Sequence, residues 1–223
     1  MSGAPGTAGD ELERARESST VGGRPVAELV RSGHLPPDPY GFRELVWADY
    51  EAHYHYKEEP AERRRLLFLP RLLTNSSLHA TLLIRLVQKA PGATTWLWRR
   101  LLLALHGCDV GRQTVIGPGL QMTHPTGIVV GVNTSIGAGV TLMQGVTVSP
   151  VTTNWRVGGE MGVLHIGDGV TVFANAGVFG PITVGDDAIV GSLALVSRDV
   201  PSRWIATRDR MRPARQDELA GVR

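Results

Sequence analysis

Apolar side chains recur every six positions through the second half of the chain, and glycine follows many of them, as at Gly117, Gly137 and Gly185. Thirteen positions obey this period: Val110, Ile116, Met122, Val130, Ile136, Leu142, Val148, Ile166, Val172, Val178, Val184, Val190 and Val196. Six-residue repeats are typical of a parallel β-helix, in which every strand turns one aliphatic side chain inward and three strands complete a coil. A β-sandwich is the alternative, but its strands recur at roughly 8 to 12 residues. The period therefore predicts a parallel β-helix, and hexapeptide helices of this type are left-handed, against the usual crossover rule.

The first half of the chain has a helical pattern instead. Apolar residues from Tyr40 to Gly107 are spaced by three and four. Asn75 offers a cap for one helix, Thr94-Thr95 offers a cap for the next, and Gly107 supplies a stop signal. Residues 1–39 lack apolar periodicity and carry helix breakers throughout, which predicts a disordered or loosely attached arm.

The expected fold class is mainly β, a left-handed parallel β-helix of hexapeptide repeats preceded by a small α-helical domain. The arm takes residues 1–39, the helical domain 40–107, the β-helix 108–200, and a C-terminal basic tail 201–223.

Two interruptions of the period are the places to look for chemistry. The first bulges out the segment Thr123-His124-Pro125-Thr126-Gly127, and a longer one separates Val148 from Ile166. Insertions in a solenoid project as loops and leave the stacked core intact. Asp109 precedes His124 by fifteen residues, three short of an eighteen-residue coil, so the two are expected near one edge in neighbouring layers. A carboxylate there can hold the imidazole in the tautomer that accepts a proton. The non-catalytic alternative fits the same spacing: His124 would be a corner residue bonded to a backbone carbonyl, and Asp109 would cap a turn.

Composition narrows the classes of partner and compartment. The 23 basic and 21 acidic side chains leave a formal charge of +2, which argues against a nucleic-acid partner. Cys108 is the single cysteine, so an internal disulfide and a multi-cysteine metal site are excluded. The first 20 residues lack the apolar core of a signal peptide, and no later stretch is long enough to span a bilayer. A cytoplasmic protein without membrane contact is expected.

The run from Asp109-Val110-Gly111 to Thr123-His124-Pro125-Thr126-Gly127-Ile128-Val129-Val130-Gly131 resembles the serine O-acetyltransferase family in spacing and in residue types. The likeness continues to Pro213-Ala214-Arg215 and reaches back to the helical segment at 78–85. The resemblance implies that His124 is the general base and Asp109 its orienting partner. The base would take the proton of an acceptor hydroxyl as that oxygen attacks the thioester of acetyl-CoA, without an acyl-enzyme and without a metal.

The resemblance also implies where the donor binds. Ala174 and Ser192 stand at positions where small side chains let the pantetheine of CoA approach the backbone. Arg208 and Arg215 of the basic tail suit the diphosphate or the ribose phosphate. A solvated basic tail is the alternative explanation of these arginines.

The acceptor is less defined, because the chain departs from the family where the family binds the amino acid. Thr123 replaces an aspartate, and Gly162-Val163 replaces an arginine–histidine pair. Thr123, Glu59 and Arg156 are the candidate substrate-binding residues, and His165 is expected to pack or to face solvent. The acceptor is therefore serine, a related hydroxy amino acid, or a hydroxyl of a sugar or specialised metabolite.

The family places its cleft between subunits, which implies a homotrimer or a dimer of trimers. Its complex with cysteine synthase uses a C-terminal isoleucine, whereas this chain ends Gly221-Val222-Arg223, which argues against that complex. The other functions to be weighed are a sugar O-acetyltransferase, a non-catalytic hexapeptide scaffold and a zinc hydratase. The last needs three converging histidines, and the spacing of His106, His124 and His165 does not match.

Overall fold

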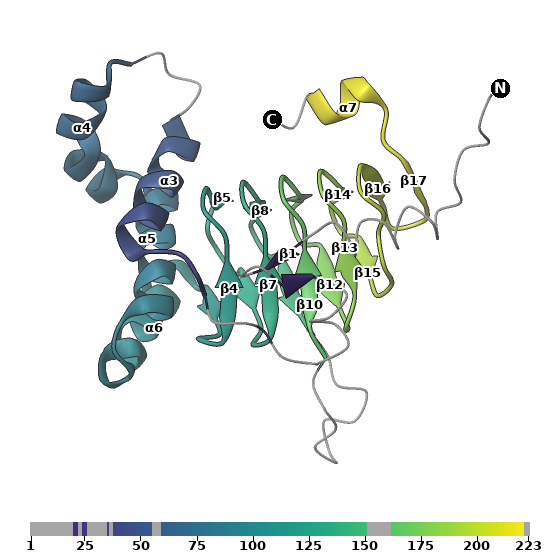
Figure 1. Cartoon of the computed structure of the whole chain (residues 1–223), viewed down its shortest axis with the longest axis horizontal. Helices are drawn as coiled ribbons and strands as arrows, with labels where there is room; N and C mark the ends of the chain where they lie inside the picture. Colours follow the sequence, from purple (N-terminus) through teal and green to yellow (C-terminus); the bar gives the residue numbers. More distant parts are fainter. Residues whose placement is uncertain are drawn as a thin grey trace.

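The computed structural model describes residues 20–21, 24–25, 35, 38–54, 59–150 and 162–220. A group of helices stands at one end of a stack of parallel strands, and the chain ends in a hairpin and a short helix at the other end (Figure 1). Most of the predicted arm at 1–39 lies outside the described residues, apart from the short antiparallel strands β1 (Thr20–Val21) and β2 (Arg24–Pro25) and a few residues near its end. None of the described helices combines the length and the hydropathy that a membrane crossing requires.

Four helices form the helical part within the described residues. They are α3 (Phe42–Tyr54), α4 (Ala61–Thr74), α5 (Ser76–Lys89) and α6 (Gly92–His106). Asn75 caps α5 as predicted, because its side-chain oxygen accepts hydrogen bonds from the backbone N–H groups of Ser77 at 2.9 Å and Leu78 at 3.2 Å. Gly107 ends α6 in the left-handed conformation at φ 62°, also as predicted.

The predicted cap at Thr94-Thr95 is wrong. The helix α6 begins at Gly92, directly after Pro91, and the hydroxyl of Thr94 donates to the Pro91 carbonyl oxygen at 3.1 Å inside the first turn. Proline starts the helix because its φ, −53° here, is already close to the helical value.

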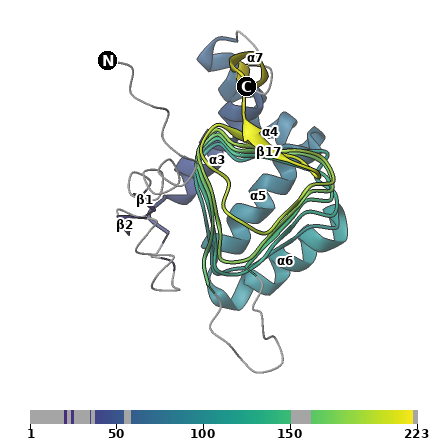
Figure 2. The same ribbon diagram turned by 90° about the vertical axis from the view of Figure 1, so that its right-hand side faces the viewer.

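The strands stack into three sheets that form the sides of a triangular prism, seen end-on in Figure 2. The β3 face consists of β3 (Asp109–Val110), β6 (Val129–Val130), β9 (Thr147–Ser149), β12 (Gly177–Phe179) and β15 (Leu195–Val196). The β4 face consists of β4 (Thr114–Ile116), β7 (Thr134–Ile136), β10 (Leu164–Ile166) and β13 (Thr183–Val184). The β5 face consists of β5 (Gln121–Thr123), β8 (Thr141–Met143), β11 (Thr171–Val172), β14 (Ile189–Val190), β16 (Trp204–Ala206) and β17 (Met211–Pro213).

The register of these sheets confirms the six-residue period. Neighbouring strands are parallel and pair equivalent repeat positions, as in the ladder Ile116–Ile136–Ile166–Val184. All thirteen periodic positions are no more than 4% exposed. The exception to parallel pairing in the three faces is β17, which pairs antiparallel with β16 before the short helix α7 (Gln216–Ala220). The predicted fold class, a β-helix preceded by helices, is thus confirmed.

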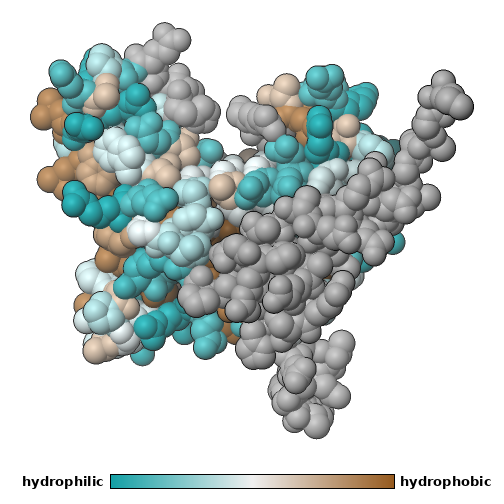
Figure 3. All heavy atoms as spheres, in the orientation of Figure 1, coloured by the Kyte–Doolittle hydropathy of each residue, from teal (hydrophilic) through white to brown (hydrophobic). Residues whose placement is uncertain are grey.

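The helices close one end of the prism. Leu83, Ile84 and Leu102 of α5 and α6 belong to the same buried cluster as the inward side chains of the first coils. Figure 2 shows α5 behind the interior of the triangle and α6 along one of its edges. Apolar surface is concentrated on these helices, and Figure 3 shows it as brown patches over the helical end of the molecule. The large exposed apolar side chains of the helical part include Leu66, Leu69 and Leu73 on α4 and Trp96, Leu103 and Leu105 on α6.

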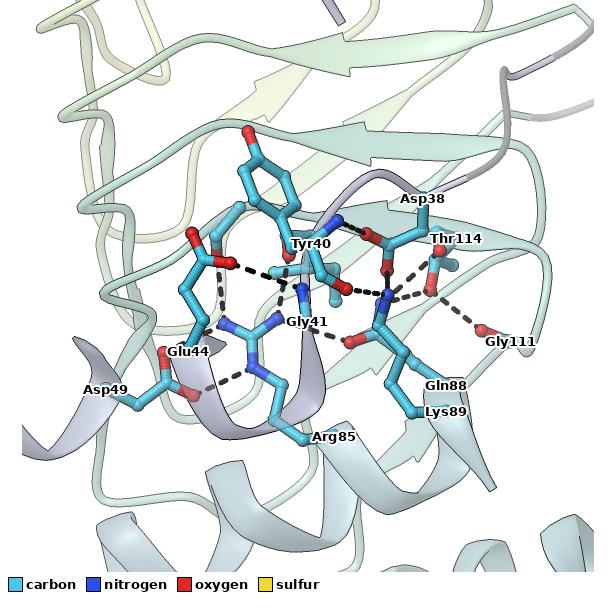
Figure 4. A network of polar contacts seen from close by, with 12 residues as sticks. Asp38, Tyr40, Gly41, Glu44, Asp49, Arg85, Gln88, Lys89, Gly111 and Thr114 are labelled. Atoms are coloured by element: carbon cyan, nitrogen blue, oxygen red, sulfur yellow. Dashed lines mark hydrogen bonds and ion pairs between the residues drawn. The ribbon is translucent and has the colours of Figure 1, made fainter. Parts of the chain in front are cut away.

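A buried ion pair joins the helices to the first coil (Figure 4). Arg85 of α5 donates from Nε and Nη2 to the two carboxylate oxygens of Asp49, both at 2.8 Å, and both residues are at most 1% exposed. The same guanidinium donates to the backbone carbonyl oxygens of Ile116 and Gly117, each at 2.7 Å. The Asp49 carboxylate in turn accepts from the N–H of Leu120 at 2.9 Å. Charged groups buried this deeply need such complete hydrogen bonding, so the network fixes how the helical part sits on the coil.

Candidate functional site

His124 directly follows β5, at the corner where the chain passes from the β5 face to the β3 face. Its side chain is exposed and its backbone has φ 53°, a conformation that non-glycine residues adopt rarely. The loop is closed by a hydrogen bond from the Thr126 N–H to the His124 carbonyl oxygen at 2.7 Å. Gly127 then donates to the carbonyl oxygen of His106 at 3.4 Å, and Gly145 of the next coil donates to that of Thr126 at 2.8 Å. The predicted bulge is therefore a loop attached to α6 on one side and to the stack on the other.

Asp109 is the first residue of β3. This strand pairs with β6, which follows the His124 loop. The N–H of Asp109 donates to the carbonyl oxygen of Ile128 at 2.9 Å, and Asp109 pairs in register with Val129. No hydrogen bond between the side chains of Asp109 and His124 is present among the described contacts. The carboxylate is held by Arg99 of α6, whose Nε lies 2.5 Å from Oδ1 and whose Nη2 lies 2.7 Å from Oδ2. These hydrogen bonds to Arg99 hold the pKa of Asp109 below its ordinary value.

The ion pair opens on a cavity between α6 and the first coil. Its volume is about 560 Å³, which is within the usual range of small-molecule pockets. The lining residues are Gly92, Thr95, Trp96, Arg99, Arg100, Leu103, Asp109 and Arg112. Sequence reasoning missed Arg99, because its position on a helix indicates an exposed side chain and says nothing of the strand across from it.

A pair of imidazoles lies beside the attachment of the loop to α6. Nδ1 of His79 on α5 and Nε2 of His106 on α6 are 2.9 Å apart and share a hydrogen bond. Burial first, and His79 second, lower the pKa of His106. Since the carbonyl oxygen of His106 also accepts from Gly127, the pair adjoins the backbone of the His124 loop. The sequence offers no signal for this contact, because the two residues belong to separate helices.

The two small residues predicted to contact CoA lie on the same corner as His124. Backbone hydrogen bonds join successive coils along that corner, beginning with the one from the Gly145 N–H to the Thr126 carbonyl oxygen. Asn175 then donates to the carbonyl oxygen of Gln144 at 2.9 Å, and Leu193 donates to that of Ala174 at 3.1 Å. Ala174 and Ser192 therefore occupy equivalent places in successive coils, the first half-buried and the second exposed. One edge of the prism carries the loop and both small residues.

The predicted phosphate-binding arginines lie at the far end of the stack. Arg208 is exposed in the turn between β16 and β17. Arg215 precedes α7, and its guanidinium lies 3.4 Å from Oε1 of Glu218 and 3.6 Å from Oδ1 of Asp217. Arg212 donates to both oxygens of Glu218, at 2.6 and 2.9 Å, and lowers the pKa of that carboxyl to about 2. The tail is therefore partly neutralised by its own acids.

The candidate acceptor-binding residues are not gathered in one place by any described contact. Thr123 ends β5 next to His124 and is half-buried. Both carboxylate oxygens of Glu59 accept hydrogen bonds from Arg71, each at 2.7 Å, within the helical part. Arg156 lies outside the described residues.

His165 packs, one of the two places expected for it. It lies on β10 between Ser135 and Thr183 of the neighbouring strands and is 4% exposed. Neither ring nitrogen has a hydrogen-bond partner among the described residues, and burial lowers its pKa to about 4. It is therefore a neutral buried imidazole. It lies on the β4 face, away from the His124 corner.

Comparison with known proteins adds independent information. No family model matches the sequence. A serine acetyltransferase from Helicobacter pylori is 34% identical over 152 residues, which cover 66% of this chain and 84% of the relative. A serine acetyltransferase from Mycobacterium tuberculosis is 37% identical over 117 residues, 48% of this chain and 49% of the relative. This chain thus spans about half the length of the Mycobacterium protein.

Solved structures show the same architecture. Soybean serine acetyltransferase complexed with serine superposes with a TM-score of 0.61 at 25% identity, covering 92% of this chain and 82% of that one. A serine acetyltransferase in complex with CoA superposes with a TM-score of 0.62 over 91% and 82% of the two chains, and its 21% identity shows the fold alone. These likenesses confirm the left-handed parallel β-helix that the period predicted.

Proposed function

This chain belongs to the serine acetyltransferase family, and we propose that it transfers an acetyl group from acetyl-CoA to the hydroxyl of L-serine or a related hydroxy amino acid. The observation that carries the proposal is the shared edge of the prism. An exposed imidazole projects from the corner loop, and the two small residues expected to contact CoA follow on the same corner in later coils. Base and thioester can therefore meet on one side of the stack.

In this proposal His124 is the general base. It takes the proton of the acceptor hydroxyl while the oxygen attacks the carbonyl carbon of the thioester. The carbon–sulfur bond then breaks, and the imidazolium returns the proton to the departing thiolate of CoA. Asp109 accepts a hydrogen bond from the second ring nitrogen and sets the tautomer. That bond is not among the described contacts, so the proposal requires the exposed His124 side chain to turn toward Asp109.

Acetyl-CoA lies along the corner in this arrangement. Ala174 and Ser192 leave room for the pantetheine to approach the backbone, since one side chain is a methyl group and the other a hydroxymethyl group. Arg208 has an exposed guanidinium that suits a phosphate group, while Arg215 has to exchange its contacts with Glu218 and Asp217 for the ligand. Arg208 is therefore the stronger candidate of the two.

For the acceptor, serine is the first choice because the soybean neighbour was solved in complex with serine. Thr123 is adjacent to the base, and Arg156 supplies a cation for the acceptor's carboxylate. Glu59 serves as an acceptor ligand only if it leaves Arg71. The residues at 162 and 163 lack polar side chains, which keeps an acceptor hydroxyl on a sugar or another metabolite as the second candidate.

We also propose that the working form is a homotrimer, alone or as a dimer of trimers. The outer side of the β3 face supports this proposal, because Val129 is 36% exposed and Leu195 is 71% exposed there, beside Leu193 at 64%. Burial of such side chains against a second subunit is favourable. The cleft of each subunit would then be completed by its neighbour.

The decisive experiment measures release of free CoA from acetyl-CoA with a panel of hydroxy amino acids and sugars. His124→Ala and Asp109→Ala are compared with Glu62→Gln, which changes an exposed carboxylate on α4. We expect serine-dependent release that falls by about 100- to 10,000-fold in His124→Ala and is unchanged in Glu62→Gln. Full activity of His124→Ala would refute the proposed base. Release that depends on a sugar and not on serine would change the acceptor.

A further inference from the structure

We propose that Arg99 is a positioning residue of this acyl transfer, which holds the Asp109 carboxylate in place between α6 and β3 and balances its charge. The inference rests on the proposed function, because it assigns a role to a residue that acts through Asp109. It assigns a role in catalysis to Arg99, an exposed residue of α6.

The geometry of the contact is the first argument. Arg99 meets Asp109 with two separate nitrogens on two separate oxygens, at 2.5 and 2.7 Å. A planar guanidinium bound in this way fixes both the position and the plane of the carboxylate, which a single contact cannot do. A carboxylate has about four acceptor positions. Arg99 takes two of them and the Val110 backbone also donates to the carboxylate, so it remains able to accept a hydrogen bond from an imidazole.

The second argument is that one helix holds both parts of the site. Arg99 and His106 are seven residues apart on α6, two turns, and therefore lie on the same side of the helix. Arg99 binds Asp109, and the carbonyl oxygen of His106 accepts from Gly127 at the end of the His124 loop. A rigid helix between these contacts keeps the carboxylate at a constant distance from the loop that carries the base.

The third argument concerns charge. Arg99 is 53% exposed and Asp109 is 35% exposed at the side chain, so their pairing adds little stability by itself. The charged groups that line the cavity with Asp109 are Arg99 and Arg100 from α6 and Arg112 from the turn after β3. The titratable pair His79–His106 lies at the C-terminal end of α6, beyond the α6 residues that line the cavity. Within the described part of the chain, Asp109 is the sole carboxylate that lines this cavity.

The consequence for catalysis follows from this balance. A carboxylate whose charge is not compensated favours the charged form of an imidazole beside it. With Arg99 bound, the carboxylate can orient the ring while its own charge is balanced by the guanidinium. Removal of the Arg99 cation is therefore expected to favour the imidazolium, which cannot accept the hydroxyl proton.

The test compares four forms of the full chain: wild type, Arg99→Gln, Arg99→Lys and Arg100→Gln. The readouts are kcat and kcat/KM for CoA release from acetyl-CoA between pH 5.5 and 9, with a thermal melt of each form. In Arg99→Gln we expect the acid limb of the pH profile of kcat/KM to move to higher pH by about half to one unit. We also expect kcat to fall by roughly 10- to 100-fold. Arg99→Lys keeps the positive charge but loses the two-nitrogen contact of the guanidinium. Its acid limb should therefore stay in place while kcat falls. Arg100→Gln is the matched control, because it removes a neighbouring cation of the same cavity that has no carboxylate partner among the described residues.

Three outcomes would overturn the inference. One is an Arg99→Gln enzyme with the wild-type acid limb and kcat. Another is the same shift in Arg99→Gln and Arg100→Gln, which would show a general field and not the pair. If the melt shows that Arg99→Gln is unfolded, an Arg99→Lys enzyme with wild-type kcat is the third. Failure of the proposed function is distinguishable from all three, since it appears as full activity of His124→Ala.

Discussion

His79 and His106 share a hydrogen bond of 2.9 Å between Nδ1 and Nε2 where α5 and α6 lie side by side. One ring must donate and the other accept, so at least one ring is neutral in this arrangement. The pKa of His106 is lowered, first by burial and then by His79. The contact is therefore sensitive to acid in a region that also holds the backbone of the His124 loop.

The first prediction concerns this pair. A histidine whose pKa is lowered in the folded chain binds a proton more readily when unfolded, so its stabilising contribution is present above about pH 6.5 and is lost as pH falls. We expect His106→Phe to lose less stability than wild type between pH 7.5 and pH 5.5. Chemical denaturation at both pH values measures the difference. An identical pH dependence in the two forms would contradict the role of the pair.

A second prediction concerns His165, which burial keeps neutral with a pKa of about 4. The unfolded chain takes up the proton at its ordinary pKa near 6.5, so between pH 7 and pH 5 this residue lowers the free energy of unfolding by about 2 kcal/mol. His165→Val removes the effect and matches Val115, which occupies the same place on β4. Urea titrations at pH 7 and pH 5 test it. The wild type should lose about 2 kcal/mol more than the variant, and equal losses would show that the ring is not buried in solution.

A third prediction concerns the buried network of Arg85 and Asp49. Arg85→Met leaves the Asp49 carboxylate without its partner in a site that is 1% exposed. We expect a loss of about 3 to 5 kcal/mol in the free energy of unfolding, measured by urea denaturation. The double variant Arg85→Met with Asp49→Leu removes both charges and should recover a large part of that loss. Additive losses in the double variant would argue against a direct coupling.

The matched control for this experiment is Arg64→Met. Nη1 of Arg64 lies 2.5 Å from Oε2 of Glu51, so the two form a close ion pair, but their side chains are 26% and 38% exposed. Water therefore solvates the remaining charge after the substitution, and the expected loss is at most about 1 kcal/mol. A cost equal to that of Arg85→Met would show that burial is not the cause.

Local patterns predicted much of the fold because they report local physics. The apolar position in every hexapeptide must face inward, so the period alone identified side chains such as Ile136 and Val178, which are at most 1% exposed. Asn75 was recognisable as a cap because its side chain bonds to its own helix. The prediction at Thr94-Thr95 was wrong because Pro91, with its preset φ, begins the helix earlier.

What the sequence by itself determined is the stack, the corner loop with His124 and the placement of Asp109 in the adjoining coil, because each follows from counting repeats. The tertiary structure alone decided the partners of those residues: Arg99 on Asp109, His79 on His106, and Arg85 on Asp49. The physical reason is that a helix shows by its period which side is buried, but not which strand or helix the other side chains meet. Those contacts depend on how α5 and α6 are set against the first coil, and that arrangement is fixed by packing between segments far apart in the chain.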